Sequence, residues 1–252
     1  AQVGSAGSDC HGPSSCVAKR IMGCGGSSFP TDPQQFLDAK VEPKYEQYLD
    51  RGSMSEDSVL KFTYKKDAQL LTDPYQVMTD DGNTVATVKT TQGGRVHLIN
   101  KEGSLVAVLV VSVRDSEVNG TDATFTHPHI YVYTFKPYKE GQKASEYVED
   151  GKALYHWCRM DKQTNVGQPK FACHMAEVRG SGHQNIEMFG AGKYNAQMDK
   201  DGRIWFKTLE GKGACLADLV GSDYKMSVSP GIDPLLMICL VSCAGIIHIR
   251  GQ

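Results

Sequence analysis

The fold is decided by the stretch Asp233-Pro234-Leu235-Leu236-Met237-Ile238-Cys239-Leu240-Val241-Ser242-Cys243-Ala244-Gly245-Ile246-Ile247. Asp233 is a good helix N-cap, and Pro234 suits the first helical position, where its missing N–H is not needed. The sequence therefore predicts a helix that begins here. A helix without a polar face lies either in a protein core or in a membrane.

Length separates these two environments for the predicted helix. A membrane span needs roughly 20 apolar residues, whereas this run has about 13 before His248 and Arg250 end it. We therefore expect the helix to be buried in protein, with a C-terminal membrane anchor as the second interpretation.

Short β-rich runs separated by glycine turns precede this helix. Val59–Tyr64, Tyr75–Met78 and Thr84–Val88 have the length and composition of strands. A glycine lies between two such runs in each of Asp81-Gly82-Asn83, Glu102-Gly103 and Asp201-Gly202. Glycine readily adopts the positive φ that tight hairpin turns require. Further strands are expected at Phe125–Phe135, Ala153–Met160, Phe171–Val178, Ile186–Phe189, Ile204–Leu209 and Tyr224–Val228. The pattern predicts an antiparallel meander.

Two other segments refine this expectation. Leu105–Val113 is apolar on both faces, which predicts a strand that is covered on each side. Pro43–Leu49 and Ser145–Asp150 are candidates for short helices or loops. A meander of this length that ends in a wholly apolar helix suggests a barrel wide enough to hold it, which requires many strands.

The C-terminal residues resemble a known superfamily. Asp223-Tyr224-Lys225-Met226-Ser227-Val228-Ser229-Pro230-Gly231-Ile232-Asp233, followed by Leu235-Leu236, is similar to the ending shared by plant LURP-one-related proteins and phospholipid scramblases, which are relatives of tubby. Tyr75–Val110 resembles the paired hairpins that open the same domain. The resemblance covers residues 55 to 252. It implies a mainly β fold: a closed antiparallel barrel of about twelve strands around a central apolar C-terminal helix.

The same comparison limits what function the resemblance implies. The chain lacks the Pro-rich arm, the run of cysteines before the barrel and the acidic calcium loop of scramblases. It also lacks a residue-by-residue match to the phosphoinositide-binding positions of tubby. A phospholipid scramblase-like transporter is therefore the second interpretation, after a non-enzymatic binding protein.

Composition excludes other classes. The chain has 252 residues, 40% of them hydrophobic, and a net charge of −2, so it has no overall positive field that would hold nucleic acid. We expect a disordered leader over residues 1–40 and one tubby-like barrel domain over residues 41–252. Eight cysteines in a chain of this length, two of them in the apolar run, favour reduced thiols.

An acylation motif lies in the expected leader. Met22-Gly23-Cys24-Gly25-Gly26-Ser27 matches the pattern for N-myristoylation of Gly23, with Cys24 beside it for a second acyl chain. Two chains give stable attachment where one gives only marginal binding. The hypothesis requires Met22 to be the initiator, and an interior glycine-rich linker is the alternative.

Histidines and cysteines form one concentration of soft ligands. It comprises His127, His129, His156, Cys158, Cys173 and His174. Because residues two apart in a strand share a face, we expect His127 with His129, and His156 with Cys158, to converge. The spacing matches no standard zinc pattern, so packing is the preferred interpretation. A thiol- or metal-dependent enzyme using Cys158 or Cys173 is the alternative.

Two groups of lysines are candidates for lipid contact. The first comprises Lys61, Lys65 and Lys66, and the second comprises Lys136, Lys139 and Lys143. Each adds up to roughly 1 kcal/mol of attraction to anionic lipid if it lies near the membrane. We therefore expect a monomeric, non-enzymatic protein on the cytoplasmic face of a membrane. It would bind lipid head groups, phosphoinositides among them, or a protein partner, with no catalytic residue, metal or cofactor.

Overall fold

A computed structural model of the chain describes residues 29, 32–38, 40–41, 47–65, 74–117, 124–162, 168–179, 186–189, 194–219 and 223–250. The chain divides into two units, Ala1–Pro30 and Thr31–Gln252. The strands of the described residues all belong to the second unit. That unit starts earlier than the predicted boundary at residue 41, because Asp32 caps a short helix, α1 (Pro33–Leu37), that contacts the barrel.

In the described residues, fifteen strands and one long helix follow α1 and a 3-10 turn at Arg51–Ser53. The strands are β1 (Leu60–Lys65), β2 (Tyr75–Thr79), β3 (Thr84–Thr90), β4 (Val96–Asn100), β5 (Leu105–Glu117), β6 (Thr124–Thr134), β7 (Val148–Glu149), β8 (Lys152–Ala153), β9 (Tyr155–Lys162), β10 (Lys170–Arg179), β11 (Ile186–Phe189), β12 (Tyr194–Met198), β13 (Arg203–Thr208), β14 (Gly213–Asp218) and β15 (Asp223–Val228). The helix, α2, spans Pro234–Arg250. The predicted start of this helix is confirmed.

Twelve strands close into an antiparallel barrel. The order around the ring is β10-β12-β13-β14-β15-β1-β2-β3-β4-β5-β6-β9, and the pairing of β9 with β10 closes it. β11 adds to β10 outside this ring, and β7 pairs with β8 in a separate hairpin. The turn glycines Gly82, Gly103 and Gly202 have φ near 80°, as the hairpin prediction requires.

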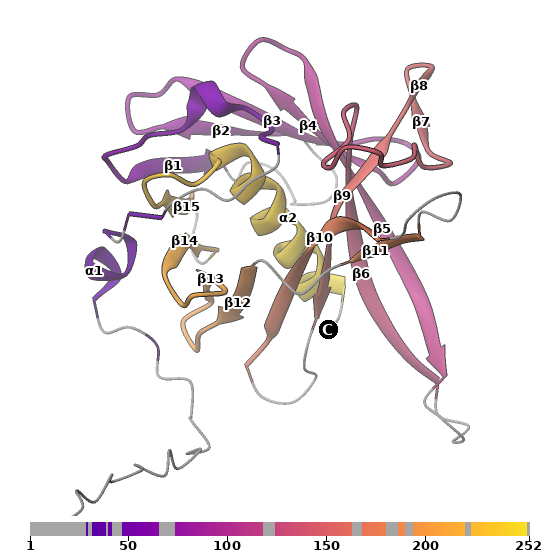
Figure 1. The fold of residues 1–252 in the computed structure, drawn as a ribbon. Helices are drawn as coiled ribbons and strands as arrows, with labels where there is room; N and C mark the ends of the chain where they lie inside the picture. Colours follow the sequence, from indigo (N-terminus) through magenta and orange to yellow (C-terminus); the bar gives the residue numbers. More distant parts are fainter. Residues whose placement is uncertain are drawn as a thin grey trace, which may run out of the picture. The chain divides into compact units, whose positions relative to one another are not determined.

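α2 occupies the interior of the barrel (Figure 1). Each described side chain from Leu235 to Ile247 is buried, and residues such as Met237, Ile238 and Leu240 have no exposed surface. The strands make room for the helix with small inward residues, among them Ala107 and Ala217, both fully buried. The central apolar helix predicted from the sequence is therefore confirmed. No helix in the described part of the chain is long and apolar enough to cross a membrane.

Asp233 fixes the start of α2 to the segment before β1. Its Oδ2 accepts a hydrogen bond from the Leu49 amide at 2.7 Å, and its Oδ1 accepts one from the Leu236 amide at 3.2 Å. Burial raises the pKa of this carboxyl to about 6, although the backbone donors act in the opposite direction. We call the end of the barrel at which α2 begins the Asp233 end.

The N-terminal segment continues across the Asp233 end. The Val41 amide donates to the Pro230 carbonyl at 3.3 Å, and the Gly231 amide donates to the Ser55 carbonyl at 2.8 Å. These two bonds hold the connection between β15 and α2, so residues distant in sequence fix the start of the helix in the barrel.

Candidate binding surfaces on the outside of the barrel

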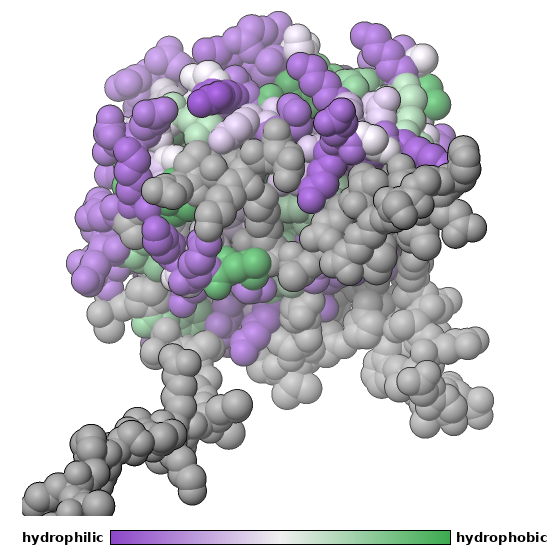
Figure 2. Space-filling model, viewed as in Figure 1, coloured by the Kyte–Doolittle hydropathy of each residue, from purple (hydrophilic) through white to green (hydrophobic). Residues whose placement is uncertain are grey.

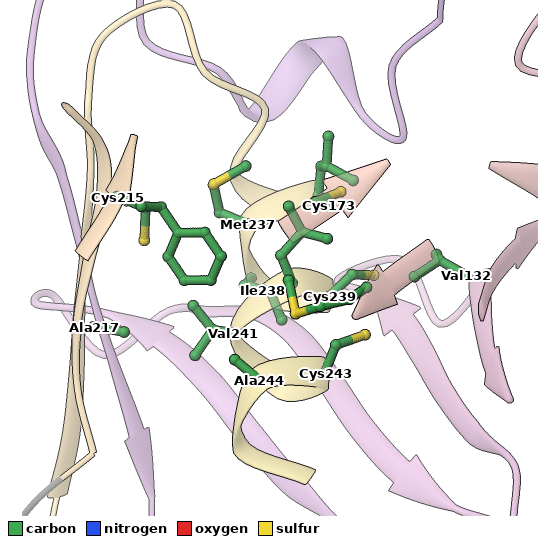
Figure 3. Close-up of a cluster of buried hydrophobic side chains, with 14 of the residues drawn as sticks. Val132, Cys173, Cys215, Ala217, Met237, Ile238, Cys239, Val241, Cys243 and Ala244 are labelled. Atoms are coloured by element: carbon green, nitrogen blue, oxygen red, sulfur yellow. The ribbon is translucent and has the colours of Figure 1, made fainter. Parts of the chain in front are cut away.

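The thiols that suggested an enzyme lie inside the barrel. Cys158 and Cys173 are buried on β9 and β10, and Cys239 and Cys243 project from α2 toward the side of Val132 (Figure 3). Cys215 lies on β14 with Ala217 (Figure 3). All five described cysteines are free thiols in the apolar core.

Burial makes these thiols poor nucleophiles. It raises the pKa of Cys215, Cys239 and Cys243 well above the usual range of a thiol. For Cys158, a hydrogen bond with Cys173 lowers the pKa, but burial and the neighbouring thiols outweigh it. Because the thiolate is the reactive form, these cysteines are held in the unreactive state.

A β-bulge separates the histidine and cysteine that were expected to converge. Val132 is opposite Cys158 and Tyr133 is opposite His156, so Trp157 is the extra residue on β9. Cys158 therefore points into the core, whereas His156 lies 2.6 Å from the hydroxyl of Tyr133, which belongs to a second cluster with Val108. The prediction that His156 and Cys158 share a face is wrong, because a bulge breaks the two-residue alternation.

The remaining histidines of that group lie on β6 and β10. His129 packs edge-on against Tyr131, with ring centroids 5.4 Å apart, and His174 lies 3.6 Å from the Asp161 carboxylate. Only the backbone of His127 is described. Among the described residues, no three His, Cys, Asp or Glu side chains are placed to hold a metal ion.

Lysines gather on the outer face of β15, β1, β2 and β3, neighbours in the ring. Lys61, Lys89 and Lys225 are exposed there, and Lys65 ends β1 on the same alternation as Lys61, although only its backbone is described. We call this surface the lysine face and define it by Lys61, Lys65, Lys89 and Lys225. It brings together two lysines of one predicted group, Lys61 and Lys65, with two lysines that the sequence did not single out.

The register explains how these lysines converge. Lys225 pairs with Thr63 across β15 and β1, which places it between Lys61 and Lys65 on the neighbouring strand. The four strands contain four lysines and a single acidic residue, Asp223. Acidic residues adjoin the face: Asp218 on β14 pairs with Lys225, and exposed Asp80 at the β2–β3 turn follows Thr79, the partner of Phe62, and so lies beside Lys61. The area over β1, β2 and β3 is mostly hydrophilic (Figure 2).

The second predicted lysine group lies elsewhere. Lys136, Lys139 and Lys143 follow β6 in a loop fixed by Trp157, whose Nε1 donates to the Lys136 carbonyl at 2.7 Å. β1 and β6 are antiparallel to each other in the barrel. Lys65 ends β1 and Lys136 follows the end of β6, so the two residues lie at opposite ends of the barrel. The two groups therefore form separate surfaces. Lys66 and the acylation residues Gly23 and Cys24 lie outside the described residues.

Comparisons with known proteins support the fold. No family model matches the chain, and no curated protein matches it by sequence. The chain is similar to a protein from Arabidopsis thaliana solved by X-ray crystallography, with a TM-score of 0.50 and 8% sequence identity. The match covers 82% of this chain and 99% of that chain. At this identity the likeness establishes the fold alone.

Proposed function

We propose that this chain is a non-enzymatic, tubby-like protein at the cytoplasmic face of a membrane, where it binds the head groups of anionic lipids, such as phosphoinositides. The observation that carries the proposal is the lysine face: its four strands contain four lysines and one acidic residue, and Lys61, Lys89 and Lys225 are exposed. Since net charge is −2, such a surface is a local departure from the rest of the chain.

The interior of the barrel supports an external binding surface. In many barrels the interior holds a ligand, but here it holds the side chains of α2. The described thiols lie in the same core, buried and protonated, so they lack the activation that a thiol enzyme needs of its nucleophile. Binding chemistry is therefore sought on the outside of the sheet.

The lysine face is suited to reversible contact. Each lysine near an anionic surface contributes roughly 1 kcal/mol, so four give about 4 kcal/mol, which corresponds to weak binding. Stable residence on a membrane needs a second signal. Acylation at Gly23 and Cys24 would supply it and would leave head-group selection to the lysine face.

Co-sedimentation with phosphatidylcholine vesicles that contain phosphatidylserine or a phosphoinositide tests the proposal. Reversal of two charges in Lys61→Glu/Lys225→Glu removes two attractive contributions, so vesicle affinity should fall by at least about thirtyfold. Affinity of the unmodified chain should also fall with added salt, because the contacts are exposed.

A matched control separates a specific face from overall charge. Lys170 and Lys200 are exposed residues on β10 and in the β12–β13 turn, away from the lysine face in the ring. Lys170→Glu/Lys200→Glu changes net charge by the same amount and should leave most of the affinity. Equal losses in the two double variants would refute a dedicated face, and no vesicle binding by the unmodified chain would refute lipid binding.

A further inference from the structure

A short arm lies against the outer face of the barrel beside the lysine face. It consists of Tyr147–Ala153 and includes β7 and β8, which pair only with each other (Figure 1). Its tip is a two-residue turn in which Asp150 and Gly151 have φ of 50° and 73°. Because the arm shares no strand pairing with the barrel, side chains hold it in place.

Aromatic and apolar side chains form one part of this attachment. Val108, Tyr131, Tyr133 and Leu154 make a small cluster on the outside of β5, β6 and the arm's base. The Tyr147 ring packs on Tyr133 with centroids 4.9 Å apart. The arm therefore covers aromatic surface that would otherwise face solvent.

An ion cluster at Glu149 forms the other part. One carboxylate oxygen of Glu149 lies 2.7 Å from Arg95 Nη1, and the other lies 3.2 Å from His97 Nε2. The same Arg95 nitrogen donates to the Val148 carbonyl at 3.0 Å, and the guanidinium lies 5.4 Å from the centre of the Tyr147 ring. The Glu149 side chain is only 17% exposed, so this carboxylate is largely enclosed.

Glu149 lies at the edge of the lysine face. His97 on β4 pairs with Lys89 on β3, and both side chains point outward from the sheet. Directly opposed residues have Cβ atoms about 5 Å apart. Lys89, Arg95 and His97 thus form a group of nitrogen donors at one corner of the face, and Glu149 is the anion that contacts two of them.

We propose that Lys89, Arg95 and His97 form a phosphate-binding site that Glu149 occupies in the free protein, so that the arm closes the site until a phosphate monoester displaces it. This inference rests on the proposed function and adds its regulation. A phosphate monoester carries more negative charge than a carboxylate, and arginine binds phosphate through paired N–H donors. It therefore competes with Glu149 for the same nitrogens.

Displacement of the arm has a second effect. It uncovers the ring of Tyr133, on which Tyr147 packs, on the same outer face as the freed nitrogen donors. Tyrosine is favoured at the boundary between lipid and water, where the ring meets acyl chains and the hydroxyl meets head groups. Opening the arm would thus add aromatic contact to the charge contact at a lipid surface.

The test compares Glu149→Gln with Glu146→Gln in vesicle co-sedimentation. The vesicles contain phosphatidylcholine and phosphatidylinositol 4-phosphate. Glu149→Gln removes the internal anion and frees Arg95, so affinity should rise about fivefold. Glu146→Gln makes the same charge change at an exposed residue at the start of the arm's segment, so its affinity should match that of the unmodified chain. Arg95→Gln/Glu149→Gln should lose the gain.

Soluble inorganic phosphate distinguishes the sources of the ligand chemistry. If inorganic phosphate abolishes the increase in vesicle affinity of Glu149→Gln, the site binds phosphate itself. If the increase persists in inorganic phosphate, the site needs the lipid surface. Both outcomes support the site. Equal vesicle affinity of Glu149→Gln and Glu146→Gln would overturn the inference. The proposed function would still stand in that case if the unmodified chain binds vesicles. A gain that persists in Arg95→Gln/Glu149→Gln also overturns it.

Amide exchange gives a readout that does not depend on affinity. The Leu154 amide donates to the Tyr147 carbonyl at 3.0 Å and so reports arm closure. In the unmodified chain, phosphatidylinositol 4-phosphate vesicles should accelerate exchange at Leu154. An exchange rate unchanged by bound vesicles would show that the arm stays closed and would overturn displacement.

Discussion

Replacing Asp233 with asparagine tests whether a buried carboxyl governs the stability of the barrel near neutral pH. Burial raises its pKa from 3.8 to about 6, a difference that corresponds to roughly 3 kcal/mol. A carboxyl with a raised pKa stabilises the folded state fully below its unfolded pKa, and this contribution is lost as pH rises through about 6. The free energy of unfolding should therefore decrease as pH rises over this range.

Asparagine cannot titrate and has one acceptor oxygen in place of two. The variant leaves either the Leu49 or the Leu236 amide without its bond, at about 1–3 kcal/mol. It also removes the buried negative charge present at high pH. The two effects nearly cancel at pH 7.5, where the variant and the unmodified chain should have similar stability, whereas the variant should be clearly less stable at pH 4.5.

Urea unfolding followed by the fluorescence of Trp157 and Trp205 measures this difference. Between pH 4.5 and 7.5, the difference in free energy of unfolding between the variant and the unmodified chain should change by roughly 2 of the 3 kcal/mol. Other titrating groups are shared and drop out of the comparison. A gap that stays constant within about 0.5 kcal/mol across this range would refute the assignment of the raised pKa.

Three further changes probe the packing. Leu240→Ala, in the middle of α2, should lower the free energy of unfolding by about 2–5 kcal/mol in urea, whereas exposed Leu209→Ala should change it by less than about 0.5 kcal/mol; similar losses would place α2 outside the core. Gly213→Ala puts a methyl group against the backbone of Phe36, so amide exchange in α1 should accelerate, and protection equal to that of the unmodified chain would contradict the contact. Reaction of the thiols with a chromogenic disulfide should be slow in the folded chain and fast in urea at the five described cysteines, Cys158, Cys173, Cys215, Cys239 and Cys243. Rapid reaction of any of them in the folded chain would argue against its burial.

Local signals account for the parts of the fold that the sequence predicted. The start of α2 follows from Asp233 and Pro234, and the hairpins follow from glycines such as Gly82 and Gly103, because caps and turns depend on a few adjacent residues. The strand at Ile186–Phe189 was predicted with its observed bounds. Caps and turns thus indicated the order of elements and the placement of the helix.

Tertiary contacts determine the parts that were missed. β14 has the sequence Gly-Ala-Cys-Leu-Ala-Asp, which has little strand propensity, yet its small inward residues Ala214 and Ala217 fit against α2. The segment Ser145–Asp150, for which a short helix or loop was expected, contributes β7, because the arm is held by Arg95, just before β4, and by His97 on β4. Such contacts are invisible in a single sequence.

The candidate site was predicted in part for the same reason. Lys61 and Lys65 were identified by their proximity in sequence, whereas Lys89 and Lys225 join them only through strand register. Lys136, from the second predicted group, lies at the other end of the barrel, after an antiparallel strand. A cluster built across strands needs the pairing, and pairing is set by the whole barrel.

The position of α2 after β15 imposes an order on biosynthesis. Domains fold as units once their residues have emerged, and here all fifteen strands leave the ribosome before the segment that fills their interior. Until then the inward surfaces of Leu98, Ile130 and Phe206 have no partner in the centre of the ring. We therefore expect the barrel to close around a packed core only after α2 has emerged.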